Sequence, residues 1–248
     1  RNSSTVFVNV TVNTAPTLNV TIVPASPTQE SQLNCSFTVS DADSDTVSAN
    51  VTWLNGSSAY TASDASFGPV ALGTWLNNGT GAIPANTTRK GQDWTCVVTV
   101  EDGTIAVSAN ASTTIGNTAP TLTNTTGILP DNANTTDALS YSLMASDLDG
   151  DALTLRVNWT GDDGQLYEEN LTIAAGSTPA SSQSVTVNLS STNTTPGMNI
   201  TLRIMGTDGT DNSNALQAMA SIRSANTPPV IDSTSPGEGF INSQENNT

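Results

Sequence analysis

The sequence repeats itself with a period of about 105 residues. Trp53 and Asp102 recur 106 positions later as Trp159 and Asp208, and the linker pattern Asn-Thr-Ala/Pro-Pro begins at 13, 117 and 226. A unit of this length is the size of a whole domain and is too long for a solenoid repeat. The chain is therefore expected to fold as domains that follow one another, which limits its architecture before any single motif is considered.

The repeat divides the chain into two complete units with a fragment at each end. The segments are 1–12, the terminal strand of a preceding or neighbouring-subunit domain; 13–116 and 117–226, the two complete domains; and 227–248, the start of a third domain or an inter-subunit segment. The fragments fit either a window on a longer array or terminal strands exchanged between subunits. The first is favoured, because both complete domains have a final strand of their own. Both arrangements predict an elongated array whose partners are copies of the chain or adjacent domains.

Apolar and polar residues alternate along several short segments. In 6–12 the four valines share one face, as in a half-buried strand. The same alternation occurs at 34–39, 47–53, 96–100, 153–159, 184–189 and 199–204. Asn-Gly and Asp-Gly dipeptides between these segments favour tight turns. The pattern predicts an all-β fold with almost no helix, made of two sandwiches of seven to nine strands each.

The charge balance and the absence of histidine exclude several classes of function. The chain has 6 basic and 22 acidic residues and a net charge of −16, so it is expected to repel nucleic acid and anionic lipid. No apolar run is long enough to span a membrane. Ser-His-Asp and Cys-His catalytic sites need a histidine, and the clustered carboxylates recur at turn positions of the repeat. We therefore expect no enzymatic activity.

Two cysteines and a tryptophan of the first repeat have a characteristic order. Cys35 lies in an early predicted strand, Trp53 follows 18 residues later, and Cys96 lies in a late strand, two positions after an aromatic residue. This order resembles the immunoglobulin-like sandwich. The resemblance implies a Cys35–Cys96 disulfide packed against Trp53 and hence an extracellular protein. A reactive or metal-binding cysteine pair is the alternative.

A wider resemblance covers about 12–227. The Asp-x-Asp runs at 41–45 and 147–151, the linker 117–120 and the segment 90–96 (Lys-Gly-Gln-Asp-Trp-Thr-Cys) look like cadherin-type repeats and tandem immunoglobulin-like repeats of archaeal or bacterial surface proteins. The resemblance implies a structural component of an extracellular filament or stalk, with domains joined end to end. The alternative is the stalk of an adhesin or a carbohydrate-binding protein. For carbohydrate binding, the aromatic residues not assigned to a core are mainly Tyr60, Trp75 and Tyr167.

Asn-x-Ser/Thr sequons are more than twice as frequent as composition predicts. There are 17 in the chain, against roughly seven expected by chance. They are at Asn2, Asn9, Asn19, Asn34, Asn50, Asn55, Asn78, Asn86, Asn110, Asn124, Asn134, Asn158, Asn170, Asn188, Asn193, Asn199 and Asn246. Because residues i and i+2 of a strand share a face, Asn and Ser/Thr both point outward where the middle residue points to the core. We expect N-glycans at most of these sites; the alternative is that Asn and Thr are simply polar filler.

Aspartates cluster at equivalent places of both repeats. Each cluster joins a run between the second and third strands to an aspartate after the penultimate strand, and these loops share the end of a sandwich where the chain enters. The sets are Asp147, Asp149, Asp151 and Asp208 in the second repeat, and Asp41, Asp43, Asp45 and Asp102 in the first. Hard carboxylate ligands without histidine suit calcium, which would neutralise and stiffen the joint. The alternative is an acidic turn whose carboxylates accept local backbone hydrogen bonds.

Overall fold

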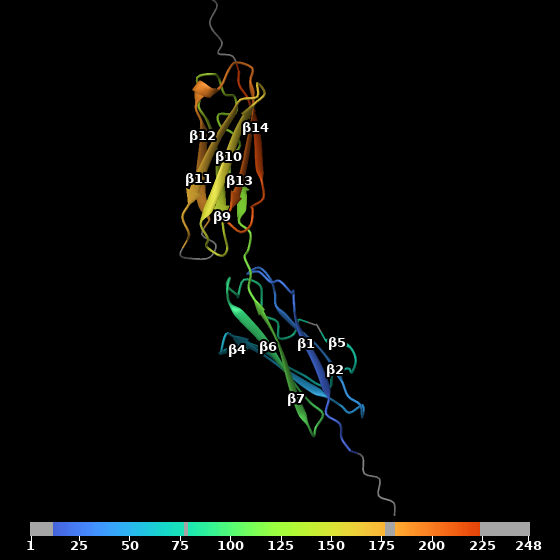
Figure 1. Ribbon diagram of the computed structural model, residues 1–248. Helices are drawn as coiled ribbons and strands as arrows, with labels where there is room; N and C mark the ends of the chain where they lie inside the picture. The colour runs from blue at the N-terminus through green and yellow to red at the C-terminus, as the bar shows by residue number, and fades with distance from the viewer. Residues whose placement is uncertain (1–11, 77–78, 177–181, 224–248) are drawn as a thin grey trace, which may run out of the picture.

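The computed structural model describes residues 12–76, 79–176 and 182–223 (Figure 1). The predicted strand at 6–12, the third-domain fragment 227–248 and the sequons at Asn2, Asn9, Asn78 and Asn246 lie outside the described residues, apart from Val12. Within them the chain forms fourteen β-strands and one short 3-10 helix, Ser191–Asn193, with no α-helix. The predicted all-β fold is confirmed.

Seven strands build the first sandwich. They are β1 (Thr17–Val23), β2 (Asn34–Ser40), β3 (Ser48–Asn55), β4 (Ser58–Phe67), β5 (Trp75–Leu76), β6 (Asp93–Glu101) and β7 (Ala106–Thr114). One sheet has the order β1-β2-β5 and the other β4-β3-β6-β7, and every pair is antiparallel. The buried residues alternate along β3 and β6, so one face of each strand packs into the sandwich.

The second sandwich has the same plan. Its strands are β8 (Thr121–Asn124), β9 (Leu139–Ser146), β10 (Leu153–Gly161), β11 (Leu166–Ile173), β12 (Gln183–Leu189), β13 (Asn199–Thr207) and β14 (Leu216–Ser221). The sheets have the orders β8-β9-β12 and β11-β10-β13-β14. Three strands facing four in this order form an immunoglobulin-like sandwich in which the fourth strand joins the sheet of the third rather than that of the second.

The two cores differ in the residues that fill the space between the sheets. In the first, Cys35 and Cys96 form a disulfide with a Cα–Cα distance of 6.0 Å, which confirms the predicted pairing, and Cys96 lies opposite Trp53 in the β3–β6 register. At the equivalent places of the second core are Tyr141 and Leu202, each 1% exposed. A bulky apolar pair therefore fills the space that the disulfide occupies in the first sandwich.

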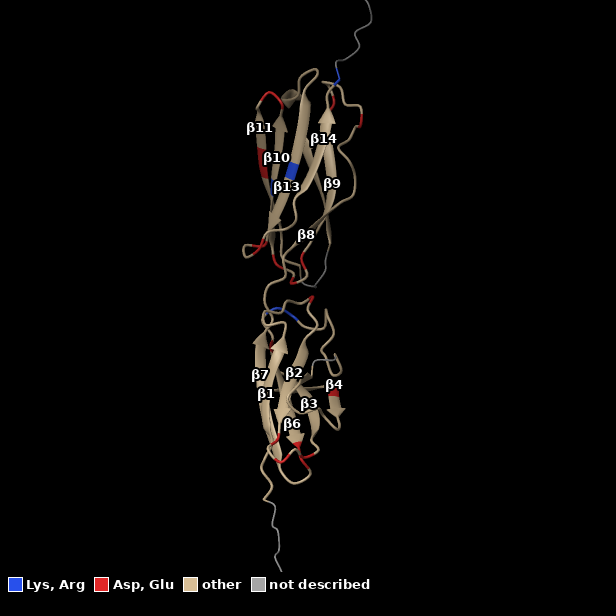
Figure 2. Ribbon diagram, turned by 90° about the vertical axis from the view of Figure 1, so that its right-hand side faces the viewer, with Lys and Arg blue, Asp and Glu red and all other residues tan. Residues whose placement is uncertain are grey.

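The sandwiches follow one another along the long axis of the molecule (Figure 1). A short linker after β7 leads directly into β8. Acidic residues lie mainly in the loops at the ends of the sandwiches, including those that face each other across the linker (Figure 2). The fold thus places both aspartate clusters where a chain enters a sandwich.

Candidate functional site at the domain joint

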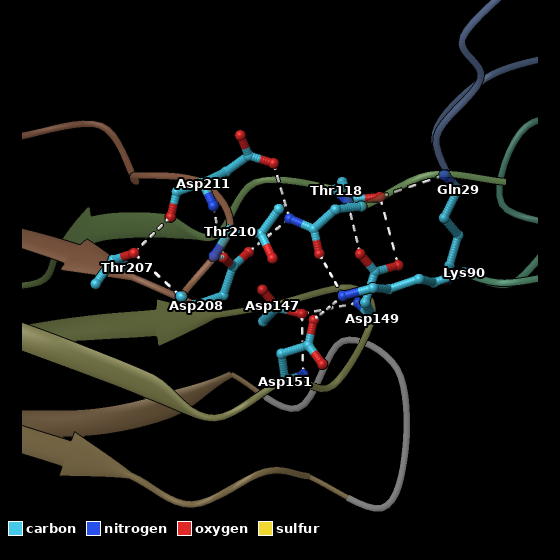
Figure 3. Close-up of polar contacts among 12 residues, drawn as sticks. Gln29, Lys90, Thr118, Asp147, Asp149, Asp151, Thr207, Asp208, Thr210 and Asp211 are labelled. Carbon is cyan, nitrogen blue, oxygen red and sulfur yellow. Dashed lines mark hydrogen bonds and ion pairs between the residues drawn. The ribbon is translucent and has the colours of Figure 1, made fainter.

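The joint cluster consists of Asp147, Asp149 and Asp151, from the β9–β10 loop, and Asp208, from the β13–β14 loop (Figure 3). A backbone kink shapes the first loop: Gly150 has a positive φ of 77°. The carboxylates first stabilise their own loops. Oδ1 of Asp147 accepts hydrogen bonds from the backbone N–H groups of Asp149 (2.9 Å) and Asp151 (3.2 Å). The alternative of an acidic turn, in which a carboxylate accepts local backbone hydrogen bonds, therefore holds for Oδ1 of Asp147.

Oxygens of Asp149 and Asp208, with one of the neighbouring Asp211, hold the linker. Asn117 Nδ2 donates to Oδ2 of Asp208 at 2.7 Å and to Oδ2 of Asp211 at 2.8 Å. The backbone N–H of Thr118 donates to Oδ2 of Asp149 at 2.5 Å, and the Thr118 hydroxyl accepts from the backbone N–H of Gln29 in the first sandwich at 3.2 Å. Thr118 is 4% exposed, so the hydrogen bonds that it makes are shielded from water. The linker is thus bonded on both sides.

A lysine of the first sandwich reaches across the joint. Lys90, in the loop before β6, donates from Nζ to Oδ2 of Asp151 and to Oδ1 of Asn117, at 2.6 Å in each case. The hydrogen bond to Asp151 and the neighbouring carboxylates raise the pKa of Lys90, although partial burial opposes this. Since both partners of the ion pair are about one-third exposed, its strength is that of a surface pair, and its main effect is to link the two sandwiches.

The same contacts recur where the chain enters the first sandwich. Asn13 Nδ2 donates to Oδ2 of Asp102 at 3.0 Å, and the backbone N–H of Thr14 donates to Oδ2 of Asp43 at 2.6 Å. Oδ1 of Asp41 accepts from the backbone N–H groups two and four residues later, as Asp147 does. We call Asp41, Asp43, Asp45 and Asp102 the N-terminal cluster. Each sandwich therefore fixes its incoming linker with the same side chains.

Hydrogen bonding and burial shift the pKa values of Asp208 and Asp147 in opposite directions. Partial burial opposes ionisation of Asp208, but hydrogen bonds from Asn117, Asp211 and Thr210 and the charge of Lys90 outweigh it, so the pKa of Asp208 is lowered. Asp147 behaves in the opposite way. Its burial and the charges of its neighbours raise its pKa, and the backbone hydrogen bonds only partly compensate.

Three of the four predicted metal ligands come together at the joint. Oxygens of Asp147, Asp151 and Asp208 lie within 4.8 Å of one another, whereas Asp149 is turned to the linker. Asp147 is 5% exposed, and its Oδ2 is buried without a hydrogen-bond partner. A buried carboxylate oxygen of this kind has the chemistry of a ligand for a hard cation.

The N-terminal cluster resembles the joint cluster in part. Oxygens of Asp41, Asp43 and Asp45 lie within 4.8 Å of one another, while Asp102 binds Asn13. Oδ2 of Asp41 is buried without a hydrogen-bond partner, as Oδ2 of Asp147 is. The two clusters differ in the residue that carries this oxygen, because Asp41 is half-buried whereas Asp147 is 5% exposed.

Asp147→Asn is expected to stabilise the second sandwich at neutral pH without divalent cations. Because burial raises the pKa of Asp147 in the folded state, its ionised form destabilises the fold, whereas Asn carries no charge and can still accept the two backbone hydrogen bonds. This penalty is complete above the folded pKa and disappears as the pH falls towards the unfolded value. Urea unfolding should therefore show a gain at pH 7 that shrinks at pH 4. The control is Asp163→Asn, in an exposed turn; an equal gain at both pH values would contradict the prediction.

The thirteen sequon asparagines that the structure describes are all exposed or half-buried. Those classed as exposed are Asn19, Asn50, Asn86, Asn110, Asn124, Asn170, Asn188 and Asn199, and those half-buried are Asn34, Asn55, Asn134, Asn158 and Asn193. The side-chain oxygens of Asn34, Asn50 and Asn193 accept hydrogen bonds, but two other sites are more constrained at the amide. Asn199 Nδ2 donates to Oδ2 of Asp162 at 2.8 Å, and Asn158 Oδ1 is buried without a partner.

The three candidate sugar-binding aromatics do not form a shared surface. Tyr60 packs edge-on against Trp94 with ring centroids 5.1 Å apart, and Tyr167 packs against the second core. Trp75, which is 55% exposed, lies in the short edge strand β5. The three rings therefore do not combine into one aromatic surface for a sugar.

Asn117, Thr118 and Lys90 were not predicted as site residues. The recurrence of Asn-Thr at each linker was the available signal for the first two, since a residue kept at both joints is expected to make the same contact. Lys90 gives no such signal, because position 196, its counterpart in the second repeat, is proline.

No protein-family model and no curated protein matches the sequence. Among solved structures, the chain is similar to the chicken CNTN1 FN1–FN3 domains, with 8% identity and a TM-score of 0.33, over 85% of this chain and 68% of that one. It is also similar to red sea bream transglutaminase, with 12% identity and a TM-score of 0.33, over 85% of this chain but 31% of that enzyme. No described helix is long and apolar enough to cross a membrane. At these values neither structure identifies a family, and the immunoglobulin-like assignment rests on the sheet topology and the disulfide.

Proposed function

We propose that this chain is part of a structural, extracellular filament or stalk in which N-glycosylated immunoglobulin-like domains are joined end to end. The observation that supports this most strongly is the repeated linker contact. Asn13 with Asp102 and Asn117 with Asp208 hold the incoming chain at 3.0 and 2.7 Å, at the equivalent end of each sandwich. A domain that binds its own incoming linker sets the direction of the domain before it, which suits an axial assembly with copies of the chain or adjacent domains as partners.

The surface composition fits an exposed fibre. Only 11% of residues are charged, and many exposed strand positions are Asn, Thr or Ser. Glycans on these positions would keep such a surface soluble and would prevent the edge strands from pairing with other sheets. On the resemblance to surface repeats and the number of sequons, an archaeal cell surface is the setting that we propose.

We predict that native protein carries glycans at most sequons, so that its intact mass exceeds the 25.5 kDa of the polypeptide. Peptide mapping should find Asn110 and Asn188, which are exposed, more fully occupied than Asn199 and Asn158, whose amides are bonded or partly buried. An intact mass equal to that of the polypeptide would refute glycosylation. Equal occupancy at all four sites would refute the role given to local structure.

A divalent cation, with calcium the best match, is a second proposal for the joint cluster. It is favoured by Asp147 Oδ2, which is buried without a hydrogen-bond partner beside Asp151 and Asp208. A cation bound only to the folded state would raise the melting temperature of the second sandwich by mass action. A melting temperature unchanged by calcium chloride or chelator would refute it.

A further inference from the structure

We propose that Lys90 and a divalent cation compete for the joint cluster, so that calcium binding breaks the ion pair that links the two sandwiches. This inference rests on the proposed cation site and adds its regulation. The joint would then have two states. In one, Lys90 of the first sandwich bonds to the joint cluster; in the other, a cation is bound by residues of the second sandwich and the linker.

The first step is that both cations need the same oxygen-rich space. Asp151 is one of the three residues whose oxygens lie within 4.8 Å of one another, and its Oδ2 already accepts from Lys90 Nζ at 2.6 Å (Figure 3). Calcium binds carboxylate oxygens at about 2.3–2.6 Å. An ion that reaches Oδ2 of Asp147 together with Asp151 and Asp208 would therefore lie within a few ångströms of the lysine ammonium, where the two positive charges repel.

The second step concerns a neutral ligand. Lys90 Nζ also donates to Oδ1 of Asn117 at 2.6 Å, while Nδ2 of the same amide is bound by Asp208 and Asp211. Calcium commonly takes amide oxygens in addition to carboxylates. Oδ1 of Asn117 is held beside the cluster by its own amide nitrogen, so release of Lys90 frees an oriented oxygen for the cation.

The competing cations differ in which parts of the molecule they connect. Lys90 is part of the first sandwich, whereas Asp147, Asp151 and Asp208 are part of the second and Asn117 is in the linker. Replacing the ammonium by a free cation keeps the bond between linker and second sandwich but removes the direct contact with the first. Calcium is therefore expected to loosen this contact, in contrast to the stiffening expected from sequence, where the carboxylates had no known cationic partner.

Calorimetric titration of the 248-residue chain with calcium chloride, in low salt, tests the competition. Lys90→Met is expected to bind calcium at least about tenfold more tightly than the wild type, because a repelling charge is removed. The matched control is Arg203→Met, which removes an exposed positive charge from the middle of β13 and should change the affinity less than about twofold. Asp147→Asn should abolish binding with either residue at position 90.

A second measurement follows Lys90 itself. In wild-type protein, the NMR signals of its ε-methylene group should move on calcium addition to the values of a solvent-exposed lysine, while those of Asn117 remain perturbed. Equal affinities of the wild type and Lys90→Met, with heat clearly observed, would overturn the competition and leave the cation site standing. No binding by any folded variant would overturn the cation site and the competition together.

Discussion

Removal of the Cys35–Cys96 disulfide, by Cys35→Ala with Cys96→Ala, is expected to lower the free energy of unfolding of the first sandwich by about 3–4 kcal/mol. The bond closes a loop between residues 61 positions apart, and its loss gives the unfolded chain more conformational freedom. For a domain of this size, the melting temperature should fall by roughly 12–30 °C. Calorimetry resolves the effect because the two sandwiches have separate cores.

The second sandwich is the internal control. Tyr141 and Leu202 occupy the equivalent positions without a covalent bond, so its melting transition should be unchanged in the double variant and in wild-type protein treated with reductant. If both transitions moved together, the cores would be coupled more strongly than the linker contacts suggest. If neither moved, the disulfide would contribute nothing to stability.

Trp53→Ala is expected to cost the first sandwich about 3–5 kcal/mol, by lost packing and the cavity left behind. The side chain is 1% exposed, its ring meets Trp94 edge-on with centroids 6.5 Å apart, and its Nε1 donates to the backbone oxygen of Gly81 at 2.6 Å. Trp75→Ala is the control in the same domain: that ring is 55% exposed, and its loss should change stability by less than about 1 kcal/mol. Similar losses in chemical denaturation of the two variants would contradict the assigned core.

Several strands were predictable from sequence because one face is buried and the other is not, but β9, whose buried and half-buried residues also alternate, was not among the predicted segments. The predicted segment 47–53 corresponds to Ser48–Asn55, and 199–204 to Asn199–Thr207, because buried and open positions alternate along both strands. Strands β4 and β11 were not among the alternating segments. They lie at sheet edges with few buried residues, so no period of two marks them.

The joint was predictable only in outline. The repeat register and the end of a sandwich shared by two loops suggested that Asp147 and Asp208 would approach the linker. That Asp149 turns to Thr118, and that Lys90 pairs with Asp151, depends on how the loops of two domains meet across a short linker. Such contacts between distant positions leave no periodic pattern in a single sequence.

The most direct test of the proposed axial assembly is whether the linker contacts hold the two sandwiches in one orientation in solution. Residual dipolar couplings of the backbone amides, measured in calcium-free buffer, report the alignment of each sandwich separately. The contacts of Asn117, Thr118 and Lys90 predict a single alignment tensor for both sandwiches in the wild type, and two different tensors in Asn117→Ala combined with Lys90→Met. Two independent tensors in the wild-type protein would show that its domains move freely, and would contradict the proposal that this chain is part of an ordered filament or stalk.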